Sequence, residues 1–157
     1  MFQYDAITSC HYLDAVISES LRRLSPASQT DRVAKQDYHI EKYNVKVPKG
    51  SSLFIAIQAL HLDPDYWEEP ERFNPDRFLP ENRDKIVPGS YAPFSMGPRH
   101  CIGMRFSLTE AKIGLAKVMM KFRFRPAPGH QFPPVLSAKP GLMAIKSPMV
   151  QVIAREP

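Results

Sequence analysis

The chain has little of what marks secreted or membrane-spanning proteins. It holds two cysteines, Cys10 and Cys101, so far apart in sequence that a disulfide framework is not expected and a reducing compartment is favoured. The longest apolar run, residues 53–57, is too short to cross a bilayer. The N-terminus shows neither the basic start nor the apolar core of a signal peptide. As given, the chain is expected to be soluble or unanchored.

Glycine is also scarce, at seven residues, whereas sixteen of the 157 residues are proline. Much proline with little glycine predicts rigid, irregular loops rather than flexible linkers. Many of these prolines fall in residues 61–98, which show little periodicity. A structureless segment of that length is uncommon, so we expect it to be functional or held by other elements. The total length suits one domain with a modest core.

The net charge of +5 is unevenly distributed. Residues 99–125 hold seven basic residues and one acidic residue, whereas residues 61–86 hold eight acidic and four basic residues. A basic region beside Cys101 is able to steer an acidic partner. An ordinary solvated helix face is the alternative interpretation. Nucleic acid is disfavoured because no nucleic-acid-binding motif accompanies the basic residues.

Hydrophobic periodicity predicts two helices. Apolar residues recur at helical spacing from Leu13 to Leu24, and Ser25-Pro26 is expected to end that helix because the residue before proline avoids the helical region. Residues 102 to about 122 form the second helix. That segment is apolar over most of its circumference, so the helix is expected to be buried.

Short strands are predicted elsewhere. Residues 38–40 and 45–47 are expected to pair across a turn at residues 41–44, and residues 53–57 form a further strand. Near the C-terminus, residues 142–145 and 149–154 are expected to close a terminal hairpin.

Cys101 is the residue with the most specific chemistry. It lies at the junction between the loop of residues 93–100 and the second predicted helix. Backbone N–H donors and the positive end of a helix dipole favour a thiolate there, and a thiolate suits a soft metal or a haem iron. Inert packing, or a catalytic cysteine with His100 or His130 as base, remains open from the residues alone. Zinc is disfavoured because His11 and His100 each adjoin a cysteine without the usual ligand spacing.

Glu19 and Arg22 are neighbours on the first predicted helix because they lie three residues apart. On a helical wheel they oppose the stripe that contains Leu13, Val16 and Leu24. The residues alone therefore favour an exposed ion pair, worth about 0.2–0.5 kcal/mol.

Three spaced motifs resemble signatures of one family. Residues 94–103, read as Phe94-x-x-Gly97-x-Arg99-x-Cys101-x-Gly103, resemble the haem-ligand loop of the cytochrome P450 family. Glu19-x-x-Arg22 resembles its E-x-x-R signature. Pro75-Asp76-Arg77-Phe78 resembles its P-E-R-F signature, with aspartate in place of glutamate. The motifs occur in the family's order, and residues 59–67 resemble animal microsomal members of the family-3-like clan.

The resemblance covers residues 1–157 as a partial domain, the C-terminal portion of a cytochrome P450. No segment resembles the family's membrane anchor, the helix that carries tryptophan and arginine to the haem, or the oxygen-activating helix. The implied fold is mainly α with small β-sheets: an E-x-x-R helix, short β-hairpins, a proline-rich meander, the cysteine loop, a long helix and a terminal β-hairpin. The resemblance also implies that Glu19, Arg22 and Arg77 form a buried triad that supports the scaffold, against the exposed pair that the helix pattern favours.

The resemblance implies a site for haem b in which Cys101 is the axial iron ligand and the catalytic residue. Gly97 would permit a tight turn, Gly103 a close approach of the helix start to the macrocycle, and Phe94 would shield the sulfur. Arg32 and Arg99 would meet the haem propionates. Two segments would line the substrate cavity: Ala27, Ser28, Gln29 and Thr30, and the hairpin tip at residues 138–143, with Leu142 and Met143.

The reaction implied for the parent protein is monooxygenation of an apolar small molecule. Its electrons would come from an NADPH-dependent reductase docking near the basic region 99–125. The parent would lie at the endoplasmic reticulum membrane, on its cytosolic face, and meet the membrane through an anchor that this chain does not show. The alternative is a truncated, catalytically inactive fragment with at most weak haem binding.

Overall fold

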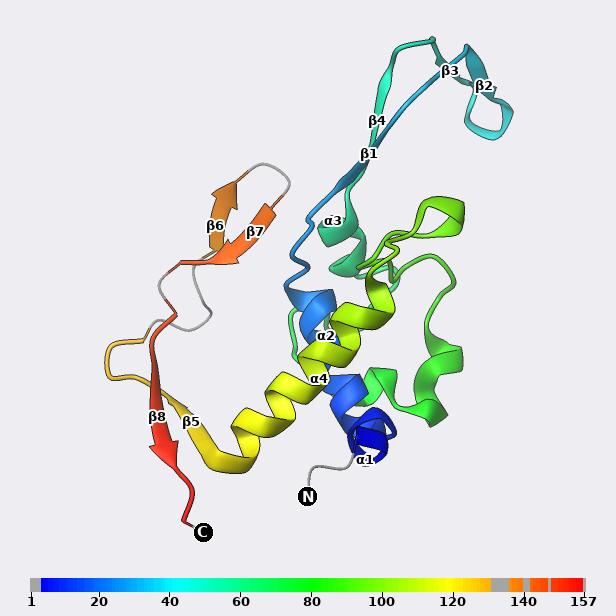
Figure 1. Ribbon diagram of the computed structural model, residues 1–157. Helices are drawn as coiled ribbons and strands as arrows, with labels where there is room; N and C mark the ends of the chain where they lie inside the picture. The colour runs from blue at the N-terminus through cyan, green and yellow to red at the C-terminus, as the bar shows by residue number, and fades with distance from the viewer. Residues whose placement is uncertain (1–3, 131–135, 140–141, 147, 157) are drawn as a thin grey trace.

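The structure, a computed structural model, describes residues 4–130, 136–139, 142–146 and 148–156 (Figure 1). It combines helices with small antiparallel sheets. The helices are α1 (Tyr4–Thr8), α2 (His11–Arg23), α3 (Ile57–His61) and α4 (Met104–Lys121), with 3-10 turns η1 (Glu41–Tyr43), η2 (Pro75–Phe78), η3 (Pro80–Lys85) and η4 (Gly97–Arg99). The strands are β1 (Thr30–Val33), β2 (Tyr38–Ile40), β3 (Val45–Val47), β4 (Ser52–Ile55), β5 (Phe122–Pro126), β6 (Leu136–Lys139), β7 (Leu142–Ile145) and β8 (Val150–Ala154).

The described strands pair into two-stranded antiparallel ribbons, β1 with β4, β2 with β3, β5 with β8 and β6 with β7. Figure 1 shows the β1–β4 ribbon leading away from the helices and carrying β2 and β3 at its far end. The predicted β2–β3 hairpin is confirmed, and Asn44 takes the left-handed conformation (φ 50°) in its turn. The predicted strand at residues 53–57 runs too far, because Ile57 already begins α3.

The predicted terminal hairpin is wrong in its pairing. β7 pairs with β6, whereas β8 pairs with β5, so that Phe122 lies opposite Ala154. The alternation of phenylalanine and arginine in residues 122–125 is a strand pattern, although the sequence analysis assigned no strand there. Alternation indicates a strand but does not identify its partner. Both β5 and β7 are possible partners for β8.

The predicted burial of the second helix is also wrong. No residue of α4 is buried, and side chains such as Phe106 and Met120 are 76% and 67% exposed. In the described chain α4 packs on α1, α2 and the start of β5, and it crosses α2 in Figure 1. A helix that is apolar nearly all round needs cover on several faces. These neighbours leave every residue of α4 at least partly exposed.

The buried core lies where the proline-rich segment packs on α2. Ala15 of α2 joins Trp67 and Phe78, with partly buried Ile86 and Tyr91 around them. The rings of Phe78 and Tyr91 are 4.8 Å apart between centroids. Residues 61–98 are therefore held in place by α2, as one of the two predicted possibilities requires. Among the described helices, none is both long and apolar enough to cross a membrane.

Candidate functional site

The loop that carries Cys101 is closed by backbone hydrogen bonds. The N–H of Cys101 donates to the carbonyl of Phe94 at 2.9 Å, and the N–H of Met104 donates to the carbonyl of Cys101 at 3.3 Å. Gly103 occupies the N-cap position of α4. The thiol thus lies immediately before the first turn of the longest described helix, and its residue is exposed and not in a disulfide.

Two residues in this loop adopt the left-handed backbone region. Gly97 has φ +76°, which glycine tolerates without steric cost, and it begins the turn η4. Ser95 has φ +62°, which is uncommon for a residue with a side chain. A Cβ at Gly103 would meet the Cys101 sulfur at 3.9 Å, an ordinary contact. The described residues therefore do not require glycine at position 103. Close approach of the helix start to a macrocycle stays the predicted reason for glycine at this position.

The surface around Cys101 is apolar and open. Met96 is 54% exposed, Phe106 is 76% exposed and Ile102 is fully exposed. Arg99 is exposed as well, whereas Phe94 is partly buried. Exposed apolar side chains gathered in this way mark a surface that a ligand or a partner covers.

Arg32 reaches this loop from strand β1. Its Nη2 donates to Ser95 Oγ at 3.5 Å, and its Nη1 donates to Thr30 Oγ1 at 3.2 Å and to the carbonyl of Asp31. The structure therefore brings the guanidinium of Arg32 to the same loop as Cys101. Arg32 and Arg99 are the two basic residues expected to meet the haem propionates.

Glu19 and Arg22 form a fully buried bidentate pair. Arg22 Nε donates to Glu19 Oε2 at 2.7 Å and Arg22 Nη2 donates to Glu19 Oε1 at 2.8 Å, with both side chains 0% exposed. The exposed pair favoured by the helix pattern is therefore wrong. The most deeply buried positions of α2 are Ala15, Ile17, Glu19 and Arg22, whereas the residues of the apolar stripe are only partly buried.

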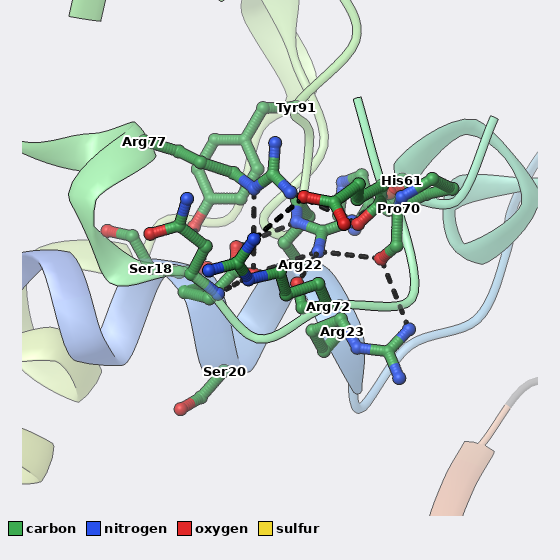
Figure 2. A network of polar contacts seen from close by, with 12 residues as sticks. Ser18, Ser20, Arg22, Arg23, His61, Pro70, Arg72, Arg77 and Tyr91 are labelled. Atoms are coloured by element: carbon green, nitrogen blue, oxygen red, sulfur yellow. Dashed lines mark hydrogen bonds and ion pairs between the residues drawn. The ribbon is translucent and has the colours of Figure 1, made fainter. Parts of the chain in front are cut away.

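The Nη1 and Nη2 groups of Arg22 also bond backbone carbonyls of the proline-rich segment. They bond the carbonyl of His61 at 2.7 Å, that of Pro70 at 2.8 Å and that of Arg72 at 3.3 Å. Figure 2 shows the Arg22 guanidinium among these partners. The guanidinium carbon also lies 5.0 Å from the centroid of the Trp67 ring. Glu19 Oε1 accepts the N–H of Asn74 at 2.8 Å, so both charges are stabilised by several bonds.

Arg77 lies at the edge of this cluster. Its Nε is 3.9 Å from Glu19 Oε1, within ion-pair range, but makes no hydrogen bond among the described residues. Its Nη2 donates to the carbonyl of Glu69 at 3.1 Å. Burial lowers the pKa of Arg77, and the Glu19 carboxylate opposes that change. Glu19, Arg22 and Arg77 are thus brought together, with Arg77 held far more loosely than Arg22.

Three residues that the sequence analysis did not assign to the site extend the network. His61 is fully buried, its Nε2 accepts the N–H of Ala92 at 2.9 Å, and its ring stacks on Tyr91. Burial raises the pKa of Tyr91 to about 12, and its hydroxyl donates to the carbonyl of Ser18. The side chain of Gln58 bonds Ser25 and Arg23 at the C-terminal end of α2. None of the three belongs to a periodic pattern in the sequence, so no local signal indicates its role.

Acid is predicted to destabilise the fold through His61. Burial lowers its pKa to about 4, helped by the Arg22 charge, while backbone groups of Arg22 and Leu21 oppose the change. The unfolded chain, with an ordinary histidine near 6.5, then binds more protons between those values. The His61 contribution is complete above pH 6.5 and is lost as the pH falls to about 4, by up to about 3 kcal/mol.

The measurement is the free energy of unfolding in denaturant at several pH values. His61→Gln should flatten the slope between pH 6.5 and 4, because glutamine does not titrate. His11→Gln, at an exposed position of α2, is the matched control and should leave the slope as it is. Equal slopes in wild type and His61→Gln would contradict this account.

A backbone hydrogen bond brings the second candidate substrate segment next to the start of the first. The N–H of Met143 in β7 donates to the carbonyl of Pro26 at 2.9 Å. Pro26 directly precedes the first segment, residues 27–30, in which the carbonyl of Ser28 accepts the N–H of Gln58. Met143 is partly buried. Of the predicted hairpin tip at 138–143, residues 140 and 141 lie outside the described residues.

The described residues favour none of the other metal or cysteine chemistries considered above. No three side chains of His, Cys, Asp or Glu gather within the described ranges in a way that would hold a metal ion. The Nδ1 of His100 bonds the carbonyl of Gly97 at 3.0 Å. In the part of the chain that the structure describes, neither His100 nor His130 hydrogen-bonds the Cys101 sulfur.

Comparison with known proteins bears out the resemblance. The family model described as Cytochrome P450 matches residues 1–152. Cytochrome P450 3A31 of Mesocricetus auratus is 44% identical over 153 residues, and Cytochrome P450 3A11 of Mus musculus is 44% identical over 154 residues. Each match covers 98% of this chain and 30% of the relative, so the chain spans about a third of their length. The chain therefore belongs to the cytochrome P450 family, whose members bind haem b.

Proposed function

We propose that Cys101 is the axial ligand of a haem iron in a haem-thiolate monooxygenase. The observation that carries this proposal is the exposed Cys101 thiol ahead of α4, in a loop closed by its own N–H. The thiolate is the form of a cysteine that binds iron. The exposed apolar side chains of Met96, Ile102 and Phe106 supply the surface that a porphyrin would cover.

The residues present fit haem better than they fit a metal ion held by protein side chains. A porphyrin provides four of the iron ligands, so one cysteine suffices, and the described residues offer no cluster of three ligating side chains. Arg32 and Arg99 would bond the propionates through charge-assisted hydrogen bonds. Phe94, partly buried beside the loop, would keep water from the sulfur.

Haem bound here would supply oxygen activation: an apolar C–H group, dioxygen, NADPH and a proton yield the C–OH product, water and NADP⁺, with thiolate donation favouring O–O cleavage. The chain's own part is to hold Cys101 in one position and to shield its sulfur. Residues 27–30 and the Leu142–Met143 segment, joined by the hydrogen bond from Met143 to Pro26, would contact the apolar substrate.

A reductase is the proposed electron donor, docking on the basic region 99–125. Arg105 is exposed in the first turn of α4, whereas the ammonium of Lys112 bonds Asp14 and so is satisfied within the chain. An acidic partner surface would therefore meet the N-terminal end of α4 rather than its middle. The endoplasmic reticulum membrane, on its cytosolic side, is the proposed location of the whole protein.

The test uses the natural protein that carries this chain, together with a reductase and NADPH. An alkylbenzene probe should be hydroxylated, and one atom of isotopically heavy dioxygen should appear in the alcohol. Label incorporated from water instead, or a product formed without NADPH, would refute the proposed reaction.

A second candidate applies to residues 1–157 on their own, as an inactive polypeptide that binds haem weakly at most. The exposed apolar side chains of α4, Phe106 and Met120 among them, favour it, because such a surface is poorly stable in water. We predict no turnover when haem, NADPH and reductase are supplied to this polypeptide. NADPH-dependent product from any apolar probe would disprove that prediction.

A further inference from the structure

His61 is hydrogen-bonded both to Arg22 of the buried ion cluster and to Ala92, which directly precedes the loop that carries Cys101. Its carbonyl accepts Arg22 Nη1 at 2.7 Å, and its ring Nε2 accepts the N–H of Ala92 at 2.9 Å. The side chain is fully buried, so water does not compete for these bonds. Figure 2 shows His61 beside Arg22 and across the network from Arg77.

Two backbone hydrogen bonds hold the chain between Ala92 and Cys101. The carbonyl of Ala92 accepts the N–H of Ser95 at 3.0 Å, and the carbonyl of Phe94 accepts the N–H of Cys101 at 2.9 Å. Ala92 is itself buried, whereas the loop beyond Met96 is exposed. His61 therefore bonds the chain at Ala92, a buried residue at the start of the exposed loop that carries Cys101.

The imidazole ring of His61 leaves a buried N–H donor poorly satisfied, a free-energy cost that an apolar ring would avoid. A backbone N–H can only donate, so Nε2 is unprotonated and the proton of the neutral ring is on Nδ1. Nδ1 is buried and meets no partner with hydrogen-bond geometry among the described residues, although backbone groups of Arg22 and Leu21 favour the protonated ring. Phenylalanine would stack on Tyr91 in the same space, 5.3 Å between centroids, without that unsatisfied donor. The acceptor at Nε2 is what distinguishes histidine here.

We propose that His61 is a positioning residue for Cys101: its Nε2 fixes the Ala92 backbone and thereby ties the thiol loop to the Glu19–Arg22 cluster. The proposal rests on the proposed function insofar as Cys101 is an iron ligand. The link from His61 to Ala92 stands apart from that function and is measurable without it.

The link is tested by amide hydrogen exchange at Ala92 in the haem-loaded natural protein and its variants. His61→Phe removes the acceptor, and exchange at Ala92 should become roughly 3- to 10-fold faster. His61→Gln places an amide oxygen within reach of the same N–H and should restore slow exchange. Trp67→Phe, in the core beside Arg22, is the control for general destabilisation and should speed Ala92 no more than other core amides.

The positioning role is tested by the spectrum of the reduced, carbon-monoxide-bound protein. His61→Phe should lose the red-shifted thiolate band on standing several-fold faster than wild type, and His61→Gln should keep it. Unchanged Ala92 exchange in His61→Phe, or a thiolate band as durable as that of wild type, would overturn the proposal. A wild-type protein without the band would instead refute the ligand assignment of Cys101, while the exchange result would still report on the His61–Ala92 bond.

Discussion

Replacement of Cys101 by serine is expected to abolish the red-shifted absorption band that a thiolate-ligated haem shows when reduced and bound to carbon monoxide. A serine hydroxyl is a hard, neutral and weak ligand, whereas the thiolate is soft and anionic. The exposed thiol lies just before α4, and serine would present only a hydroxyl at that position. The measurement is the difference spectrum of the natural protein that carries this chain, with haem content determined in parallel.

Two further variants make this result specific. Cys10→Ser should keep the band, because Cys10 is an exposed N-cap residue of α2 whose side chain makes no capping hydrogen bond. Cys101→His should retain some haem through nitrogen but lose the thiolate band and the turnover that depends on it. A thiolate band that survives in Cys101→Ser would show that another residue is the ligand.

The cysteine loop is the part of the site that the sequence described best. The spacing of Gly97, Cys101 and Gly103 carried the family resemblance, and the structure gives Gly97 the left-handed conformation that its residue type allows. Such a loop depends on residues that lie close together in the sequence, so its motif can be recognised directly. The His61–Ala92 bond joins residues 31 apart in a segment without periodicity, so no local pattern predicts it.

Burial of Glu19 and Arg22 shows why residue pattern alone fails at a polar core. Their place opposite the apolar stripe of α2 favoured solvent exposure, yet both are fully buried. The partners that make this possible are the carbonyls of His61, Pro70 and Arg72. Carbonyl groups belong to the backbone and leave no trace in residue type, so only the resemblance indicated the buried arrangement.

The pairing of the C-terminal strands and the exposure of α4 have a different cause. Strand alternation and apolar content are properties of one segment, whereas pairing and burial depend on what lies next to it. β8 forms a strand where one is expected but pairs with β5. α4 is as apolar as predicted, yet α1, α2 and β5 cover only part of it.

Arg22→Ala is predicted to reduce strongly the amount of folded, haem-containing protein, and not only its turnover. The change leaves the Glu19 carboxylate fully buried without its bidentate partner, and it also frees the carbonyls of His61, Pro70 and Arg72. Breaking a buried pair in this way costs about 3–5 kcal/mol. A typical domain has about 5–15 kcal/mol of stability in total. Denaturant unfolding and haem content per polypeptide are the measurements.

Substitutions of the neighbouring arginines serve as comparisons for the loss of stability in Arg22→Ala. Arg23→Ala breaks a contact with the largely exposed Glu71 and should cost under about 1 kcal/mol. Arg77→Ala should fall between the two, because Glu19 keeps both bonds from Arg22 and loses a charge 3.9 Å away. Arg22→Lys keeps the charge but not the bidentate geometry, and should recover only part of the stability. Normal haem content and unfolding midpoint in Arg22→Ala, with turnover lost, would mean that Arg22 acts in the chemistry and not in the scaffold.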